Sequence, residues 1–322
     1  MKQIIPQVVR DQIRQFNVQT KKLNQGRYLR AWTDCSLCFL LLGCAPDDYY
    51  QFSFPGKSWK ERGSFLTYRR NHRMIKKYNP RELEALLHKD AFDARFSAYI
   101  GRECCALDRE TGDARLKEFL KRHKKAFMKQ KNSACGRGAF ILTEEEYLSG
   151  KFPIFDFDDY VAEECIVQHH ELARLNPYAV NSIRVLTFHN VILQAGLKVG
   201  VGSSVVDNVH AGSVYGNIDL ETGKTNAPFR NIDLDSFTTH PTTGEPLVGF
   251  QIPHWELLKS VVTEIAEALP EIPYIGWDVA VTENGVCIIE GNDEPGQDGE
   301  ITGIYPAIRK IEKEQQKLKE KR

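Results

Sequence analysis

The sequence has no long apolar run and little cysteine. Its best apolar stretch, Cys38 to Cys44, is far shorter than the roughly 20 residues needed to cross a bilayer. The amino-terminal MKQIIPQVVRDQIRQ carries charges among its apolar residues, so it lacks the uninterrupted apolar stretch of a secretory signal. Eight cysteines in 322 residues are too few for a disulfide scaffold. We therefore expect a cytoplasmic protein without a transmembrane segment.

The sequence also lacks an excess of either charge and a complete zinc motif. With 43 basic and 43 acidic side chains the net charge is zero, so no nucleic-acid partner is expected. Cys35 and Cys38 form a CxxC pair, but no second pair completes a metal site. Their apolar surroundings favour buried helix residues over metal ligands.

The composition is that of a folded, enzyme-sized chain. Apolar residues make up 42% and charged residues 27%, which excludes disordered and low-complexity proteins. Residues 1–95 have helical spacing and a basic character. From about residue 127, short apolar runs separated by turn residues predict strands, and a helix is predicted over 253–269.

Segment 57–77 concentrates basic residues. It contains eight lysines and arginines against Glu61 alone, with Trp59, Phe65 and Tyr68 between them. Such a segment suits peripheral contact with an anionic partner, either a phosphorylated substrate or a membrane surface. A solvated helix face is the simpler interpretation, and we favour it.

The strongest chemical signal is the segment 274–296, YIGWDVAVTENGVCIIEGNDEPG. It predicts two strands joined by a three-residue loop, Glu283-Asn284-Gly285, whose glycine suits a left-handed last position. This register opposes Asp278 to Glu290 on one face and places Asn292 one step along that face. Opposed carboxylates repel unless a cation lies between them, and oxygen ligands suit Mg²⁺. A two-residue turn would instead place the two acids on opposite faces.

A lysine followed by small residues is a second candidate. Lys129 ends a short apolar strand, and Ser133, Gly136 and Gly138 follow it. Small residues let backbone amides approach phosphate oxygens, and the lysine adds a positive charge. The spacing matches neither a Walker A loop nor a GxGxxG loop, and an ordinary glycine-bearing hairpin has the same composition.

Two further segments carry polar residues. Arg184 lies within an apolar strand, so we expect it to contact an anion, either a triphosphate or an internal carboxylate. His169 and His170 follow an apolar run; on a strand they would point to opposite faces, and no shared metal is expected. The loop 205–216 contains candidate substrate-binding residues, although such loops also form simple turns. These candidates are Asp207, Asn208, Ser213 and, as a base toward an amine, His210.

Together these segments resemble the ATP-grasp fold, and specifically its sugar-transfer-associated branch. The resemblance rests mainly on NSIRVLT and on the WD…IIEGN ending, and it covers about residues 90–305. It implies an α+β fold with two subdomains that clamp ATP, preceded by a mainly helical region. The implied boundaries are a helical region 1–95, a smaller lid subdomain 96–165 and a larger catalytic subdomain 166–305 within the ATP-grasp domain 96–305, and a charged helix 306–322.

The resemblance also assigns roles to individual residues. It implies Asp278, Glu290 and Asn292 as magnesium ligands, and Lys129 and Arg184 as phosphate contacts. Adenine and ribose would be held by the strand that contains Glu163, Glu164 and Ile166. Two positions depart from the family: Gln130 stands where proline is frequent after the lysine, and Asp93 is not followed by the usual lysine.

The implied reaction is an amide-forming ligation that consumes ATP with Mg²⁺. A carboxylate would be activated as an acyl phosphate and then attacked by an amine. The branch further implies a sugar or cell-surface glycan precursor as substrate, in polysaccharide biosynthesis. A phosphotransferase and a non-catalytic nucleotide- or glycan-binding module are the alternatives.

Overall fold

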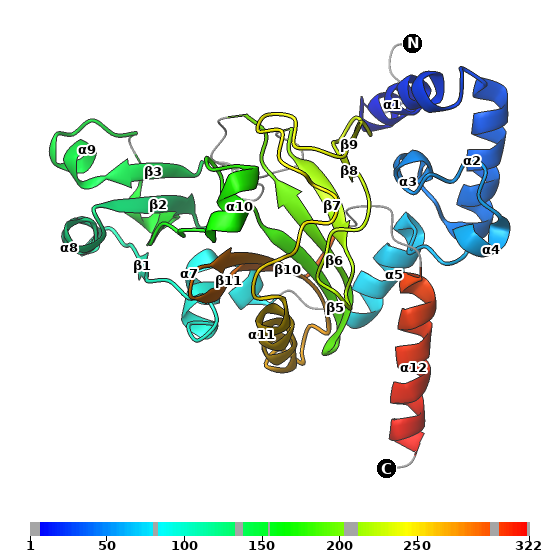
Figure 1. Ribbon diagram of the computed structural model, residues 1–322. Helices are drawn as coiled ribbons and strands as arrows, with labels where there is room; N and C mark the ends of the chain where they lie inside the picture. Colours follow the sequence, from blue (N-terminus) through cyan, green and yellow to red (C-terminus); the bar gives the residue numbers. More distant parts are fainter. Residues whose placement is uncertain are drawn as a thin grey trace, which may run out of the picture.

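Two antiparallel sheets organise the molecule, which we describe from a computed structural model over residues 7–79, 83–132, 138–153, 155–202, 212–296 and 303–320. The small sheet lies at one side of the large sheet, and the amino-terminal helices within residues 7–78 lie at the other (Figure 1). This arrangement confirms the predicted α+β class and the helical amino-terminal region.

The first four helices have an aromatic core of their own, whereas the next three pack against the large sheet. In α2 the apolar side chains of Ala31, Cys35 and Cys38 form one buried stripe against Phe16, Tyr49 and other aromatic residues. Burial raises the pKa of the Cys35 thiol to about 12, so the prediction of buried helix cysteines is confirmed. The helices are α1 (Gln7–Leu23), α2 (Tyr28–Leu42), α3 (Pro46–Gln51), α4 (Trp59–Arg62), α5 (Tyr68–Tyr78), α6 (Glu84–Leu87) and α7 (Lys89–Arg95).

The small sheet has the strand order β1-β4-β2-β3. Its central strand β4 pairs on both sides, so the main chain of Glu163 lies opposite Cys104 of β1 and Phe127 of β2. Leu116 and Phe119 of helix α8 pack on this sheet. The elements are β1 (Cys104–Ala106), α8 (Gly112–His123), β2 (Lys125–Gln130), β3 (Phe140–Thr143), α9 (Glu144–Leu148), the 3₁₀ helix η1 (Phe157–Asp159) and β4 (Tyr160–Glu163).

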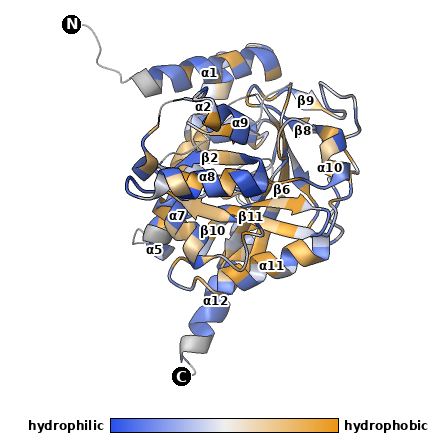
Figure 2. Ribbon diagram, turned by 90° about the vertical axis from the view of Figure 1, so that its left-hand side faces the viewer, coloured by the Kyte–Doolittle hydropathy of each residue, from blue (hydrophilic) through white to orange (hydrophobic). Residues whose placement is uncertain are grey.

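The large sheet has the strand order β11-β10-β5-β6-β7-β8-β9. Leu258 and Val262 of α11 pack with Val279 of β10, while Phe96, next to α7, packs against Trp277. Figure 2 shows the apolar residues along β10 and α11 and the polar surface of α12. The elements are α10 (His170–Leu175), β5 (Ile183–Phe188), β6 (Val191–Val199), β7 (Val214–Ile218), β8 (Phe229–Arg230), β9 (Ser236–Phe237), α11 (Trp255–Glu267), β10 (Tyr274–Thr282), β11 (Gly285–Asn292) and α12 (Ile304–Glu320).

The β10–β11 hairpin differs from its predicted register. Thr282 pairs with Gly285, so the connection is a two-residue turn and the predicted three-residue loop is wrong. A β-bulge then shifts the register between Asp278 and Val279. Because a bulge adds one residue to one strand, it cancels the shift and brings Asp278 opposite Glu290.

The paired histidines also differ from prediction. His169 and His170 lie at the start of α10, where their rings stack at 4.4 Å between centroids. The expectation that they point to opposite faces of a strand is therefore wrong. His170 Nδ1 lies 2.8 Å from the Oε1 atom of Glu283.

Candidate active site

Asp278 and Glu290 are directly opposed on β10 and β11, as predicted. The Oδ1 atom of Asp278 lies 2.9 Å from Arg184 Nε on β5 and 3.1 Å from Lys198 Nζ on β6. Four adjacent strands thus contribute charged side chains to one site. Arg184 contacts an internal carboxylate, which was one of its two predicted partners. Lys198 was missed, although a lysine in the apolar run VILQAGLKVG is a signal of the same kind as Arg184.

The two acids have different electrostatic surroundings. Burial would raise the pKa of Asp278, but the positive charges of Arg184 and Lys198 outweigh it and hold this pKa below its usual value. Burial, together with the negative charge of Asp278, raises the pKa of Glu290. An added cation would therefore stabilise the ionised form of Glu290 more than that of Asp278.

Asn292 completes the set of predicted metal ligands. It follows Glu290 by two residues on β11, and its Nδ2 atom donates a hydrogen bond to Glu290 Oε1 at 3.5 Å. Two carboxylates and an amide supply the oxygen donors that Mg²⁺ takes. The negative charge of Glu290 is poorly compensated by the protein, which is a physical reason for a cation at this place. These residues therefore fit a magnesium ion.

Gly276 makes room for the arginine of this site. A Cβ atom at Gly276 would lie 2.9 Å from Nη1 of Arg184 and 3.0 Å from Cβ of Pro295. Real Cβ contacts rarely come this close. The guanidinium of Arg184 therefore occupies space that a side chain at Gly276 would take, and a substitution there would displace it.

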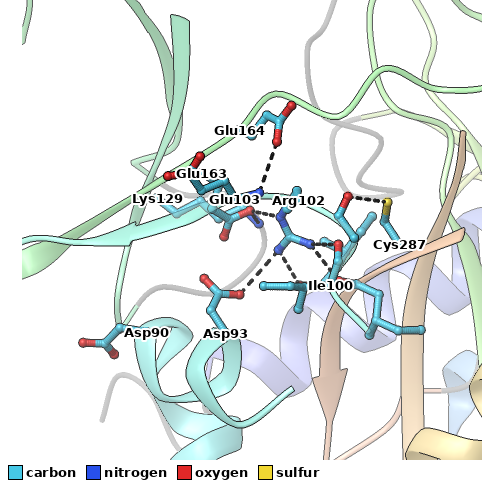
Figure 3. Close-up of polar contacts among 12 residues, drawn as sticks. Asp90, Asp93, Ile100, Arg102, Glu103, Lys129, Glu163, Glu164 and Cys287 are labelled. Carbon is cyan, nitrogen blue, oxygen red and sulfur yellow. Dashed lines mark hydrogen bonds and ion pairs between the residues drawn. The ribbon is translucent and has the colours of Figure 1, made fainter. Parts of the chain in front are cut away.

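A second group of charges, the ion cluster, consists of Asp93, Arg102, Lys129 and Glu163 (Figure 3). The Oε2 atom of Glu163 accepts hydrogen bonds from Arg102 Nε at 2.7 Å and lies 2.8 Å from Lys129 Nζ. Burial would raise the pKa of Glu163, but these two cations lower it to about 2. The predicted phosphate-contacting lysine thus lies against the carboxylate of a predicted nucleotide-binding strand.

Arg102 connects this cluster to the bulge of β11. Its Nη1 atom donates to the carbonyls of Ile100 at 3.0 Å and Ile288 at 2.8 Å, and its Nη2 atom donates to that of Ile289 at 3.4 Å. Ile289 is the residue skipped by the strand register, immediately before Glu290. One buried guanidinium therefore holds both the small sheet and the backbone that carries Glu290. Sequence reasoning missed Arg102, since its partners are backbone carbonyls distant in the chain.

Lys89 is another residue that sequence reasoning missed. It begins α7, and its pKa is lowered by burial, with Glu290 and Lys129 next among the charges that act on it. Lys89 therefore adds a positive charge that acts on both Glu290 and the ion cluster. The only signal in the sequence is its position in the basic, helical region before the first strand.

The chain crosses from the small sheet to the large one through 164–168. The Glu164 amide donates to the Glu103 carbonyl at 2.8 Å, and Gln168 forms a bridge with Thr282 of β10. Ile166, between them, is half-buried. The predicted nucleotide-binding residues Glu164 and Ile166 thus lie on the connection between the sheets.

The other predicted residues lie partly outside the described ranges. Gly138 has a left-handed φ of 72°, and a Cβ atom there would lie 2.9 Å from Gln130 Oε1, so glycine is required. Ser213 is buried immediately before β7. The predicted residues that fall outside the described ranges are Ser133, Gly136, Asp207, Asn208 and His210.

The fold has two antiparallel sheets, and its carboxylate and amide oxygens lie next to the basic side chains of Arg184 and Lys198. This combination is the one expected of an ATP-grasp protein. The model of the family described as sugar-transfer associated ATP-grasp matches residues 122–313, and the chain belongs to this family. No curated protein matches it.

Solved structures show distant similarity. The ATP-grasp ligase PsnB, complexed with a minimal precursor, Mg and ADP, is 12% identical with a TM-score of 0.43, over 82% of this chain and 70% of that one. D-cycloserine synthetase DcsG is 9% identical with a TM-score of 0.42, over 73% and 74%. D-alanyl-alanine synthetase A from Vibrio cholerae O1 biovar eltor is 13% identical with a TM-score of 0.41, over 69% and 60%.

Proposed function

We propose that the protein is an ATP- and Mg²⁺-dependent ligase that joins a carboxylate to an amine. The observation that carries this proposal is the opposition of Asp278 and Glu290 beside Asn292, with Arg184 and Lys198 at the same place. Family membership supports ATP as the nucleotide, and the family's association with sugar transfer favours a glycan precursor as substrate. We propose cytoplasmic polysaccharide biosynthesis as the setting.

In this proposal Asp278, Glu290 and Asn292 hold Mg²⁺, which would neutralise charge on the phosphate oxygens when bound. Arg184 and Lys129 stabilise the γ-phosphoryl group while a substrate carboxylate oxygen attacks phosphorus and ADP leaves. An amine then attacks the acyl carbon, phosphate leaves, and the amine proton passes to a base. We assign that base to His210.

The remaining assignments concern binding. We propose that the small sheet belongs to a lid subdomain, 96–165, that closes over the nucleotide on the catalytic subdomain, 166–305. The connection 164–168 supports this, because it is the place where a nucleotide would contact both sheets. Phosphates would contact Ser133, Gly136 and Gly138; adenine and ribose would contact Glu163, Glu164 and Ile166; substrate would contact Asp207, Asn208 and Ser213.

Glu290→Gln is the sharpest test of this proposal. Because burial and Asp278 already oppose ionisation of Glu290, a neutral isostere should fold at least as stably as the parent. Loss of a metal ligand should nevertheless lower Mg²⁺-dependent ADP release by roughly 100-fold or more. The exposed acid Glu145 supplies the control, since Glu145→Gln should leave turnover unchanged.

The assay is ADP release with pairs of carboxylates and amines, including amino acids and uronic acids, with mass spectrometry of the products. An amide product supports the ligase, whereas a phosphorylated product would show a phosphotransferase. Substrate-independent ATP binding without ADP release would show a non-catalytic module. Full activity of Glu290→Gln would refute the metal assignment.

A further inference from the structure

Helix α2 carries apolar residues on its solvent side as well as on its buried side. One stripe, Ala31, Cys35 and Cys38, is buried in the amino-terminal core. The other side carries exposed leucines next to Arg30, Thr33 and Ser36, and a cluster of exposed apolar side chains is typical of a contact surface. The exposed fractions are 84% for Leu29, 44% for Leu37, 68% for Leu40 and 67% for Leu41.

The exposed side of α2 continues onto Trp59. Arg62 pairs with Asp34 of α2 at 2.7 Å, and its guanidinium lies 5.0 Å from the centre of the Trp59 ring. Trp59 is therefore held next to α2, yet its side chain is 46% exposed. Tryptophan beside exposed leucines is typical of surfaces that enter the membrane interface.

Basic side chains adjoin this apolar surface. Arg69 lies next to the carboxyl end of α2. Its amide donates a hydrogen bond to the Gly43 carbonyl at 3.0 Å, and its guanidinium lies over the Phe39 ring. Lys60 and Arg73 are exposed. Within the described residues no ion pair forms at Lys60, Arg69 or Arg73. The single acid of segment 57–77, Glu61, is bonded to Ser58.

We propose that this surface docks on a membrane that contains anionic lipids. We call it the α2 surface, made of Leu29, Leu37, Leu40, Leu41 and Trp59 with Lys60, Arg69 and Arg73. The leucines and Trp59 enter the membrane interface, while the basic groups contact lipid phosphates. The aliphatic part of Lys60 lies along the apolar surface and its ammonium group stays at the level of the phosphates.

Charge and position favour a membrane over a second copy of the chain. A two-fold contact through the α2 surface would bring the same basic groups of both copies together. Figure 1 shows α2 at the side of the molecule away from the small sheet, so docking there leaves the candidate active site accessible. Among the described residues, no helix is long and apolar enough to cross the bilayer, so the contact is peripheral.

Cosedimentation of the full chain with vesicles tests the proposal without requiring turnover. We expect binding to vesicles that contain phosphatidylglycerol, weaker binding at high salt, and none to pure phosphatidylcholine. Loss of one cation should weaken binding about fivefold, so the double variant Lys60→Glu/Arg73→Glu should weaken it by at least about 25-fold. Leu40→Ser/Leu41→Ser should weaken it at least tenfold with the same net charge.

Matched controls lie on the small sheet's helices. Leu148 is 69% exposed on α9, and Lys121 is exposed on α8; Leu148→Ser and Lys121→Glu should bind as the parent does. Absence of binding by the parent, or unchanged binding of Leu40→Ser/Leu41→Ser, would overturn the proposal. The proposal would also be overturned if the parent protein sedimented as a dimer and the Leu40→Ser/Leu41→Ser variant sedimented as a monomer. ADP release without vesicles is unaffected by any of these variants, so this proposal and the ligase assignment fail separately.

Discussion

Replacement of Arg102 by methionine should destabilise the protein more than any surface substitution. The guanidinium is buried and donates to Glu163 and to three backbone carbonyls, two of them next to the β11 bulge. Methionine keeps most of the volume but leaves Glu163 with Lys129 alone and the carbonyls without their donor. Removal of one partner of a buried ion pair costs about 3–5 kcal/mol of unfolding free energy, and we expect a loss in this range.

Urea unfolding followed by tryptophan fluorescence measures this loss. Arg122→Met is the matched control, because Arg122 pairs with Glu103 at 2.6 Å on the surface, where solvent screening leaves such pairs with little effect on stability. Arg102→Lys should fall between, since it keeps the charge but not the planar fork. A loss below about 1 kcal/mol for Arg102→Met, or equal losses for both arginines, would refute the reasoning.

Two further predictions concern Asp93 and Gly276. Burial and the charge of Glu163 raise the pKa of Asp93 to about 6, above its unfolded value, so its ionisation destabilises the fold as pH rises through 6. Asp93→Asn should therefore be more stable at pH 8 by up to about 3 kcal/mol, with the difference vanishing near pH 4; a pH-independent difference in urea unfolding would contradict this. Gly276→Ala should displace Arg184 and lower kcat for ADP release. Gly244→Ala meets no atom within 4 Å but has a left-handed φ of 76°, so it should strain its own turn and leave kcat unchanged; equal kcat values would contradict the steric argument.

Periodicity in the sequence predicted the elements better than their connections. The apolar runs at 183–188, 191–199 and 274–282 are strands of the large sheet. Such runs predict strands because a strand that is buried in a sheet needs apolar side chains along its length. The hairpin turn was mispredicted, since Gly285 pairs with Thr282 and begins β11, which leaves Glu283 and Asn284 as the turn. The apolar run 160–168 suggests one strand, but only Tyr160–Glu163 form one, and the rest crosses to the large sheet, where Gln168 forms a single bridge with Thr282.

Residues whose partners are backbone atoms were the hardest to predict. Asp278, Glu290 and Asn292 lie in one hairpin, so local register brings them together, whereas Arg102 reaches carbonyls 186 and 187 residues away. A bulge has no clear local signature in the sequence. The opposition of the two acids was therefore predicted correctly for a partly wrong reason.

The charges around the acids argue for one added cation. Arg184 and Lys198 contact Asp278, while Arg102 and Lys129 contact Glu163. Each of these carboxylates thus has two cations within hydrogen-bond distance, and their pKa values are lowered. The pKa of Glu290 is raised although Lys129, Arg184 and Lys89 act on it, because burial and the charge of Asp278 outweigh these cations. A divalent ion held by Glu290, Asp278 and Asn292 would offset both the burial of Glu290 and its repulsion from Asp278.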